Sequence, residues 1–557
     1  MDIKRLILFV IFSFSILMLW DTWQKKHEPI VAPVASTQGS VQDASIPNAS
    51  SVAVVGSTPS NSVPNTGTAF KLDSAQRINV STDLFQAEID TLGGDLRRLT
   101  LNKHRASDSQ DNFVLLDDAA KPMLYVAQTG LIGKDLPNHK SLFTTQAISY
   151  SMPATADSQE VRLSWVGTGA NAGVNVDKIY TFHRNSYVID VTYQISNGSA
   201  TAITPSVYYQ ILHDNKSNQG SKMMPTFTGG AYYTDVDKYK KISFSDMEKK
   251  KFSKTANDGW VGLVQHYFAG AWIPKAGVSR EYYTDKLSDT IYSIGAIAPI
   301  GSIAAGSKTE LTAKLFTGPQ THGDLVAAAP GLEYTVDYGW LTVVAKPIFW
   351  LLTKIQAVVI NWGVAIILLT VFIKAAFYPL SAASYKSMAK MRELAPRLQT
   401  LKEKYGDDRQ KMQQAMMELY KTEKINPMGG CLPILVQVPV FISLYWVLLG
   451  SIELRHAPFF GWIHDLSAID PFYILPVLMG ATMIIQTKLN PKPADPMQAK
   501  VMQIMPVVFS VFFFFFPAGL VLYWLVNNIL SISQQWYINK TIHAETVAKK
   551  SGVTKVK

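Results

Sequence analysis

One basic residue, Lys374, lies near the end of an otherwise apolar segment of the chain. Thr370 precedes it by four residues, so both side chains lie on the same face of a helix. A charge in the hydrocarbon of a membrane costs roughly 2.5–3.5 kcal/mol on insertion scales, so such a residue marks a functional site by default. Lys374 could attract an acidic group into a region that otherwise excludes charge.

A second group of polar side chains lies in apolar segments closer to the C-terminus. Four of them recur at spacings of four, three and four, which places them on one face of a helix: Trp524, Asn528, Ser531 and Gln535. Gln437 adds an amide to another apolar segment. The cores of these segments contain no Asp or Glu that could pair with Lys374. We therefore expect the polar side chains and Lys374 to share a hydrated cavity.

The alternative is that Lys374 extends along its helix to the membrane surface, as long basic side chains do near the ends of spans. It lies about seven residues before a basic loop, which corresponds to roughly 10 Å of helix. Tyr378 and Pro379 lie between Lys374 and that loop, and polar residues on other segments offer it partners. We therefore favour a hydrated cavity around Lys374 over extension to the membrane surface, and we expect this cavity in the cytoplasmic half of the membrane.

The rest of the chain contains no recognisable catalytic or metal-binding motif. His183, His213 and His266 are isolated, and neither HExxH nor GxSxG occurs. A phosphate-binding GxxxxGK[ST] loop is also absent. Cys431 is the only cysteine, which excludes an intrachain disulfide and a thiolate metal cluster. We predict no catalytic residue, no metal and no cofactor.

The apolar residues are concentrated in blocks. Hydrophobic residues make up 48% of the chain and charged residues only 17%. Because a helix that crosses a bilayer needs about 20 apolar residues, the blocks predict six membrane spans. These are residues 1–23, 355–380, 429–450, 471–487, 501–516 and 520–537, the last four within a predicted helical region at 427–537. Residues 1–23 are interpreted as an uncleaved anchor, since no small-residue cleavage site follows the apolar run.

The basic residues indicate how the spans are oriented. Residues 381–426 are rich in Lys and Arg, whereas residues 451–470 carry only Arg455. By the positive-inside rule, the first loop, the basic tail at 538–557 and the N-terminus are cytoplasmic, and the large region between the first two spans is outside. The chain has a formal net charge of +10. We therefore expect its basic residues to contact lipid headgroups rather than nucleic acid.

Between the first two spans the sequence predicts a linker and then a β-sandwich. Residues 24–69 are rich in Ser, Ala, Val, Pro and Asn, the composition of a disordered tether without chemistry of its own. In residues 70–335 apolar and polar residues alternate instead. In 187–195, for example, every second residue is apolar, which is the period of a half-buried strand. Residues 260–268 are predicted to form one core strand. Turn signals separate such strands, at 93–94, 197–198, 229–230 and 318–319.

Residues 338–354 combine Trp and Leu with Lys346 and Lys354. This composition suits an amphipathic helix that lies on the membrane surface. A simple extension of the following span is the alternative.

The basic loop at 381–426 is predicted to be helical. Apolar residues recur at spacings of three and four on both sides of Gly406, which indicates an antiparallel hairpin with a kink at Pro396. We predict that this hairpin docks partners through Met388, Arg392, Arg397, Asp407 and Asp408. Its other methionines could form an adaptable docking surface, but the seam between the two arms explains Met391, Met412 and Met416 more simply.

Several motifs in the C-terminal half resemble the YidC family of membrane-protein insertases. They are Tyr378-Pro379-Leu380 before the basic hairpin, NPMGGCLP at 426–433, WIHDLS at 462–467, DPFYILP at 470–476 and FPAGLVLYW at 516–524. The resemblance is specific over residues 338–537 and extends more loosely across the region predicted to be β-rich.

The resemblance implies a multi-pass protein of a bacterial inner membrane, with a periplasmic domain of β-supersandwich fold and a five-helix core. Members of this family have a hydrophilic groove that is open to the cytoplasm and to lipid. A basic residue in the groove receives the acidic tail of a nascent membrane protein. The implied partners are therefore nascent membrane proteins, the Sec translocon, and the ribosome with its targeting machinery.

The chain departs from the family pattern at two positions. Lys374 stands where the family typically has Arg, so charge attraction is retained but bidentate recognition of a carboxylate is lost. Trp524 stands where Tyr is common, which keeps a ring and a donor but removes an acceptor. Thr370 matches the family.

We therefore expect an energy-independent membrane-protein insertase and chaperone, not an enzyme. A secondary transporter is one alternative, but such proteins commonly contain internal repeats, and none is evident here. A membrane-tethered sugar-binding or mutarotase-like protein, with its function in the β-domain, is the other.

Overall fold

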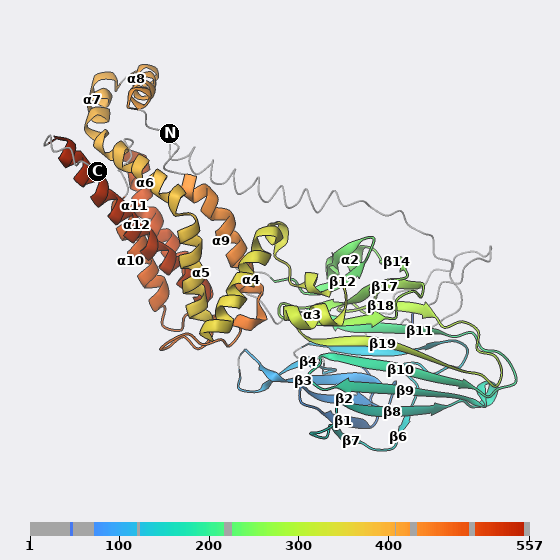
Figure 1. Cartoon of the computed structure of the whole chain (residues 1–557). Coiled ribbons are helices and arrows are strands. Elements are labelled where there is room, and N and C mark those ends of the chain that lie inside the picture. Colours follow the sequence, from blue (N-terminus) through green and yellow to red (C-terminus); the bar gives the residue numbers. More distant parts are fainter. Residues whose placement is uncertain are drawn as a thin grey trace. The chain divides into compact units, whose positions relative to one another are not determined.

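The computed structural model describes residues 45–47, 72–107, 109–119, 123–216, 226–406, 408–423, 432–489 and 496–550. These residues form two compact units (Figure 1). The β unit lies within residues 36–337 and includes 450–452, and the helical unit comprises the remainder from residue 338 onward. The predicted anchor at 1–23 lies outside the described residues.

The strands of the β unit form two sheets, ten-stranded and nine-stranded as far as the described residues extend. The larger sheet contains β1 (Arg77–Ser81), β2 (Phe85–Asp90), β3 (Asp95–Arg105), β4 (Asn112–Leu116), β5 (Tyr125–Ile132), β7 (Ser149–Ser151), β11 (Ser206–Asp214), β14 (Ser253–Ala256), β17 (Arg280–Lys286) and β18 (Ile291–Pro299). The smaller sheet contains β6 (Thr144–Thr145), β8 (Ser158–Val166), β9 (Val174–His183), β10 (Val188–Asn197), β12 (Gly229–Thr234), β13 (Lys238–Ile242), β15 (Trp260–Val264), β16 (Phe268–Pro274) and β19 (Lys308–Pro319).

The larger sheet runs β14-β17-β18-β11-β5-β3-β2-β1-β7, with β4 on β3. The smaller sheet runs β13-β12-β15-β16-β19-β10-β9-β8-β6. The two sheets share one apolar core, to which both contribute alternate residues. In β10, for example, Ile189, Val191, Tyr193 and Ile195 are fully buried, which confirms the alternation predicted for this strand. Short helices complete the unit: η1 (Gly169–Asn171), α2 (Phe244–Lys249), α3 (His322–Ala328) and η2 (Leu332–Thr335).

Three local predictions for the β unit are wrong. Residues 260–268 form two strands, because the chain reverses after Gln265, whose N–H donates to the carbonyl of Phe268 at 2.9 Å. The Gln320 amide donates to the carbonyls of Gln265 and Phe268 and so stabilises this turn. Two predicted turns lie at the ends of strands instead: Gly229-Gly230 begin β12 and Gly318-Pro319 end β19. A Cβ on Gly230 would lie 2.5 Å from the Met247 methyl group, so packing rather than a turn accounts for this glycine.

His213 is a fully buried histidine in β11. Its Nδ1 donates to the carbonyl of Asp214, and its Nε2 lies 3.2 Å from the amide nitrogen of Gln265, which donates to it. Burial lowers the pKa of His213 to about 4, although the carbonyl and carboxylate of Asp214 act in the opposite direction. The neutral imidazole is therefore the form that folding selects.

Acidification is expected to destabilise the β unit through His213. The folded-state pKa lies below the unfolded value of about 6.5, so the unfolded chain binds more protons between these values. The contribution of neutral His213 to the free energy of unfolding is fully present above about pH 6.5. It is lost as the pH falls toward 4, by about 3 kcal/mol in total. Thermal unfolding of the full chain between pH 7 and 4.5 measures the effect. His213→Gln should flatten the pH dependence, and an unchanged slope would contradict this assignment.

The helical unit contains η3 (Gly339–Leu341), α4 (Thr342–Val359), α5 (Trp362–Ala376), α6 (Tyr378–Glu393), α7 (Ala395–Tyr405), α8 (Arg409–Thr422), α9 (Leu432–Gly450), α10 (Ile474–Leu489), α11 (Pro496–Phe513) and α12 (Ala518–Lys550). A short helix, η5 (Ile452–Leu454), follows α9. The long helix α12 packs against α5, α6 and α10 (Figure 1). This packing brings polar residues of α12 next to the end of α5.

The predicted helix boundaries around the second span need correction. The predicted helix at 338–354 continues to Val359, and the predicted span at 355–380 is interrupted at Ile360, which has a φ of +56°. The Asn361 side chain then accepts from the N–H of Val364 at 3.0 Å and caps α5. A second interruption, at Phe377, separates α5 from α6, and the two helices are bent by 66°.

One helix among the described residues, Gly339–Val359, is long and apolar enough to cross a membrane on its own. The α5–α6 pair meets the same criterion if it is taken as one bent span. Val436–Gly450, Ile474–Leu489 and Lys500–Phe513 are shorter apolar helices.

The basic loop forms helices that reverse direction, as predicted. The chain turns between Tyr405 and Asp408, and α7 packs against α8. The first arm is broken at Leu394, between α6 and α7, rather than kinked within one helix. Pro396 lies in the first turn of α7, where its missing N–H leaves no hydrogen bond unmade.

Candidate functional site

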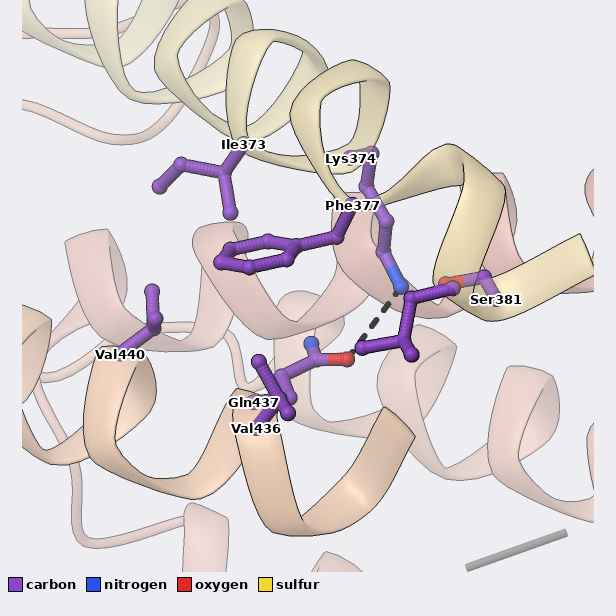
Figure 2. A pocket seen from close by; sticks show the side chains of 8 residues that line it. Ile373, Lys374, Phe377, Ser381, Val436, Gln437 and Val440 are labelled. Carbon is purple, nitrogen blue, oxygen red and sulfur yellow. Dashed lines mark hydrogen bonds between the residues drawn. The ribbon is translucent and has the colours of Figure 1, made fainter. Parts of the chain in front are cut away.

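Lys374 lies in the last turn of α5 and is only 8% exposed. Its Nζ donates to the hydroxyl of Ser531, on α12, at 2.7 Å, and to the side-chain carbonyl of Gln437, on α9, at 3.4 Å. Figure 2 shows the side chain pointing toward Gln437, with Phe377 alongside it. Three helices from distant parts of the sequence therefore meet at one ammonium group.

The orientation of the Gln437 amide is fixed by Asn527. The amide nitrogen of Gln437 donates to the side-chain oxygen of Asn527, so its carbonyl oxygen is left to face Lys374. Ser531 in turn donates to the backbone carbonyl of Asn527 at 2.7 Å, which leaves its lone pairs for Lys374. Asn527 thus orients both acceptors of the ammonium group.

Asn527 was not among the site residues expected from the sequence. The helical spacing selected its neighbour, Asn528, as a member of the polar stripe. A signal was nevertheless present, because Asn527 precedes Ser531 by four residues and therefore shares its helical face.

Two members of the expected polar stripe face α10 instead of Lys374. The amide of Asn528 donates to the Thr482 hydroxyl at 3.3 Å, and the amide of Gln535 donates to the carbonyl of Leu489 at 3.1 Å. Of the four stripe residues, Ser531 is the one that the structure brings into contact with Lys374. The side chains of one helical face thus diverge to two neighbouring helices.

Trp524 and Thr370 lie in apolar surroundings. The Trp524 ring contacts Phe441 edge-on, with a centroid separation of 4.4 Å, and lies 5.2 Å from the ring of Phe513. Its indole N–H is buried without a hydrogen-bond partner among the described residues. The hydroxyl of Thr370 donates to the carbonyl of Ile366 at 2.6 Å, so its hydrogen bond stays within α5.

A small cavity lies beside the ammonium group. It has a volume of about 20 Å³, enough for a single water molecule. Apart from Lys374 and Gln437, its lining is mostly apolar (Figure 2): Ile373, Phe377, Leu380, Ser381, Val436 and Val440. The cavity is therefore narrower than the hydrated cavity expected from the sequence.

The charge of Lys374 is balanced by dipoles alone. Within the part of the chain that the structure describes, no carboxylate pairs with it. An ammonium group has three N–H donors, and two are used by Ser531 and Gln437. This arrangement can accept an additional anionic group, such as a carboxylate, without first breaking an ion pair.

The residues expected to dock partners on the hairpin have local contacts. Arg397 pairs with Glu423 at 2.6 Å and so joins α7 to the end of α8. Asp408 caps α8 by accepting from the N–H groups of Gln410 and Lys411. Met388 is half-buried on α6. Asp407 and the side chain of Arg392 lie outside the described residues.

Comparison with known proteins identifies two matching family descriptions. The YidC periplasmic domain matches residues 77–351, and the 60Kd inner membrane protein matches residues 354–545. The membrane protein insertase YidC of Methylobacillus flagellatus is 66% identical over 554 residues, which cover 99% of each chain. That of Aromatoleum aromaticum is 51% identical over 550 residues, which cover 98% of this chain and 99% of the relative. A crystal structure of an active YidC insertase covers 84% of this chain and 93% of its own, with 19% identity and a TM-score of 0.39.

Proposed function

Because the chain belongs to the YidC family of membrane protein insertases, we propose that the buried ammonium group of Lys374 is the point at which it receives the polar tail of a nascent membrane protein. The protein is an insertase rather than an enzyme. The observation that carries the proposal is a buried cation with neutral hydrogen-bond partners only, among the described residues. Neither a transporter nor a mutarotase-like protein is favoured, since relatives matched over the whole chain are named insertases.

In the proposed mechanism, an acidic tail enters from the cytoplasmic side and accepts from the third N–H of the Lys374 ammonium group, which neither Ser531 nor Gln437 uses. A hydrogen bond to a charged group contributes about 1.5–3 kcal/mol, which offsets part of the cost of removing the tail from water. The membrane potential acts on the same charge, at about 2.3 kcal/mol per unit charge per 100 mV. Burial of the apolar segment in lipid, at roughly 25 cal/mol per Å², then drives insertion without nucleotide hydrolysis.

The apolar residues that line the cavity support binding of a substrate that carries an apolar segment next to its acidic tail. Val436, Val440 and Phe377 lie beside the ammonium group, so a substrate has apolar contacts within reach of its charged end. The cavity must widen to admit a polypeptide, because about 20 Å³ holds one water molecule. The groove residues in this proposal are Lys374, Thr370, Trp524, Asn528, Ser531, Gln535 and Gln437, with Asn527 added by the geometry.

We further propose six spans, with both termini and the hairpin at 381–426 in the cytoplasm and the β unit in the periplasm. The domain limits proposed from the sequence are 1–23, 24–69, 70–335, 338–354, 355–380, 381–426, 427–537 and 538–557, of which the limit between 354 and 355 is moved to the break at Ile360 by the observed helix ends. The bacterial inner membrane, the Sec translocon and the ribosome are the proposed surroundings and partners. The asymmetric distribution of Lys and Arg supports this orientation.

Photocrosslinking tests the site with two neighbouring positions on α9. Val436 lines the cavity, whereas Val438 does not and is 44% exposed. A photoreactive amino acid at 436 should capture a stalled nascent membrane protein several times more efficiently than the same residue at 438. Capture should decrease when the acidic tail of the substrate is neutralised. Equal capture at the two positions would contradict a substrate path along this cavity.

A further inference from the structure

Three residues of the predicted linker are held against the β unit. Ser45, Ile46 and Pro47 are described by the structure, and Pro47 is buried while Ile46 is half-buried. The sequence predicted that residues 24–69 form a tether with no chemistry, and this prediction is wrong for these three residues. Their backbone and side-chain contacts are specific, because Ser45 accepts hydrogen bonds from two buried side chains, His139 and Gln210.

The contacts lie on the face of the larger sheet that points away from the main core. In β11, Val207, Tyr209 and Ile211 belong to the core between the sheets. Because side chains alternate along a strand, Tyr208 and Gln210 point to the opposite face. They are nevertheless 0% and 1% exposed, so this second face is also covered. We call the group of side chains Tyr208, Gln210 and His139 on this face the linker socket.

Hydrogen bonds orient the donors of the linker socket. The backbone N–H of His139 donates to the Tyr208 hydroxyl at 3.0 Å, and the same hydroxyl lies 2.5 Å from His139 Nδ1, which we assign as the acceptor of its proton. Burial lowers the pKa of His139, and its neutral ring therefore carries the proton on Nε2. That N–H donates to the Ser45 hydroxyl at 3.1 Å.

The second donor is fixed in the same way. The Tyr283 hydroxyl donates to the side-chain oxygen of Gln210 at 2.7 Å, which directs the Gln210 amide nitrogen toward Ser45. That nitrogen donates to the Ser45 carbonyl at 3.3 Å and to the side-chain oxygen of Gln128 at 2.9 Å. The linker socket thus presents two preorganised donors, one to the side chain and one to the backbone of a serine.

The chain just after the linker returns to the same face of the sheet. Leu72 packs against a small cluster that includes Leu212, which lies two residues after Gln210 in β11 and therefore points to the same face. The Arg97 guanidinium also donates to the carbonyl of Asp73 at 3.3 Å. The chain therefore contacts the β unit within the linker, at 45–47, and again just after it, at 72–73.

The sequence of the bound segment suits binding by so few residues. Proline fixes its own backbone φ and restricts the preceding residue to extended conformations, and the β-branched Ile46 is further restricted at χ1. A Ser-Ile-Pro segment, which turns at Ser45 and bends at Ile46 in the structure, thus has fewer conformations to lose when it binds. Residues 57–59 (STP) and 62–64 (SVP) have the same order of serine, β-branched residue and proline.

We propose that the linker socket is a binding site for a serine–β-branched residue–proline segment, and that Ser45-Ile46-Pro47 of the chain's own linker is its occupant. The chain between the first apolar segment and the β unit acts as a tether. When the segment is bound, this tether ends at residue 45, whereas it would otherwise extend to residue 72. The linker socket therefore sets how far the β unit can move from the N-terminal segment.

Site-specific crosslinking in the full chain tests the proposal. A small diazirine amino acid in place of Ile46 should form intramolecular crosslinks to peptides that contain residues 133–143 or 206–214. The same amino acid at Thr58, in the matched 57–59 segment, is the control and should give scattered, weaker products. Scattered products from position 46 as well would overturn the proposal.

The hydroxyl contact is tested in the same assay. Ser45→Ala removes the acceptor of His139 and should lower the yield of socket crosslinks about fivefold or more, whereas Ser45→Thr should retain them. A millimolar peptide with the sequence ASIPN should compete, and AAIPN should compete less well. An unchanged yield with Ser45→Ala, or equal competition by the two peptides, would show that the serine is not recognised.

Discussion

Replacement of Lys374 by alanine is expected to slow the insertion of membrane proteins with acidic translocated tails by about tenfold or more. The estimate follows from the loss of a charged hydrogen bond, at about 1.5–3 kcal/mol. Substrates with neutral tails should be affected much less, since they cannot form this bond. The rates can be compared by reconstituting each variant in vesicles and measuring protease-protected tails of both classes.

Two control variants separate this effect from a loss of folding or of general surface charge. Lys374→Arg keeps the charge and should retain insertion of both classes. Lys354→Ala removes an exposed lysine on α4 and should leave both classes unchanged. If Lys374→Ala slowed acidic and neutral tails equally, the lysine would have a structural role rather than a role in recognising the substrate.

Replacement of Asp470 by alanine is expected to have the largest effect on the stability of the helical unit. Asp470 is fully buried before α10. One carboxylate oxygen accepts from the Trp462 indole at 2.9 Å and the N–H of Phe472 at 3.0 Å, and the other from the N–H of Leu475 at 2.7 Å. Alanine would leave these three donors without an acceptor, at about 1–3 kcal/mol each. A loss of at least about 3 kcal/mol is therefore expected.

Thermal unfolding in a fixed detergent, followed through near-ultraviolet signals, measures this loss. Asp470→Asn keeps one acceptor oxygen and should destabilise less than alanine. Asp465 is the control in the same segment: its carboxylate is 21% exposed, accepts from the N–H and the hydroxyl of Ser467 and lies 3.3 Å from His456 Nδ1. Because water can replace these partners, Asp465→Ala should cost about 1 kcal/mol or less. Similar losses for the two alanine variants would contradict the assignment of Asp470 as the principal anchor of α10.

A lysine rather than an arginine at position 374 has a geometric consequence for the proposed groove. An arginine presents five N–H donors in a planar fork, whereas the Lys374 ammonium has three, and Ser531 and Gln437 occupy two of them. One donor remains for a substrate carboxylate in this arrangement. The expected interaction is therefore a single hydrogen bond with charge attraction, consistent with discrimination by charge rather than by the shape of the acidic group.

The amino-acid sequence alone was sufficient to predict the features that depend on local pattern. The alternation in 187–195 indicated β10, because the period of a strand does not depend on its neighbours. The apolar segments and the isolated Lys374 indicated a membrane protein with a buried cation, since the cost of a charge in hydrocarbon is independent of the fold. Helical spacing also placed Ser531 on the correct face of α12.

The tertiary structure alone decided which distant side chains meet. Lys374 is bound to residues 63 and 157 positions away, and only the packing of α5, α9 and α12 brings them together. Asn527 and Asn528 are adjacent in sequence but contact different helices, because one residue corresponds to about 100° of rotation around a helix. The hydrogen bonds between Ser45 and the linker socket were unpredictable from composition, because a polar, proline-containing segment binds only where another part of the fold presents oriented donors.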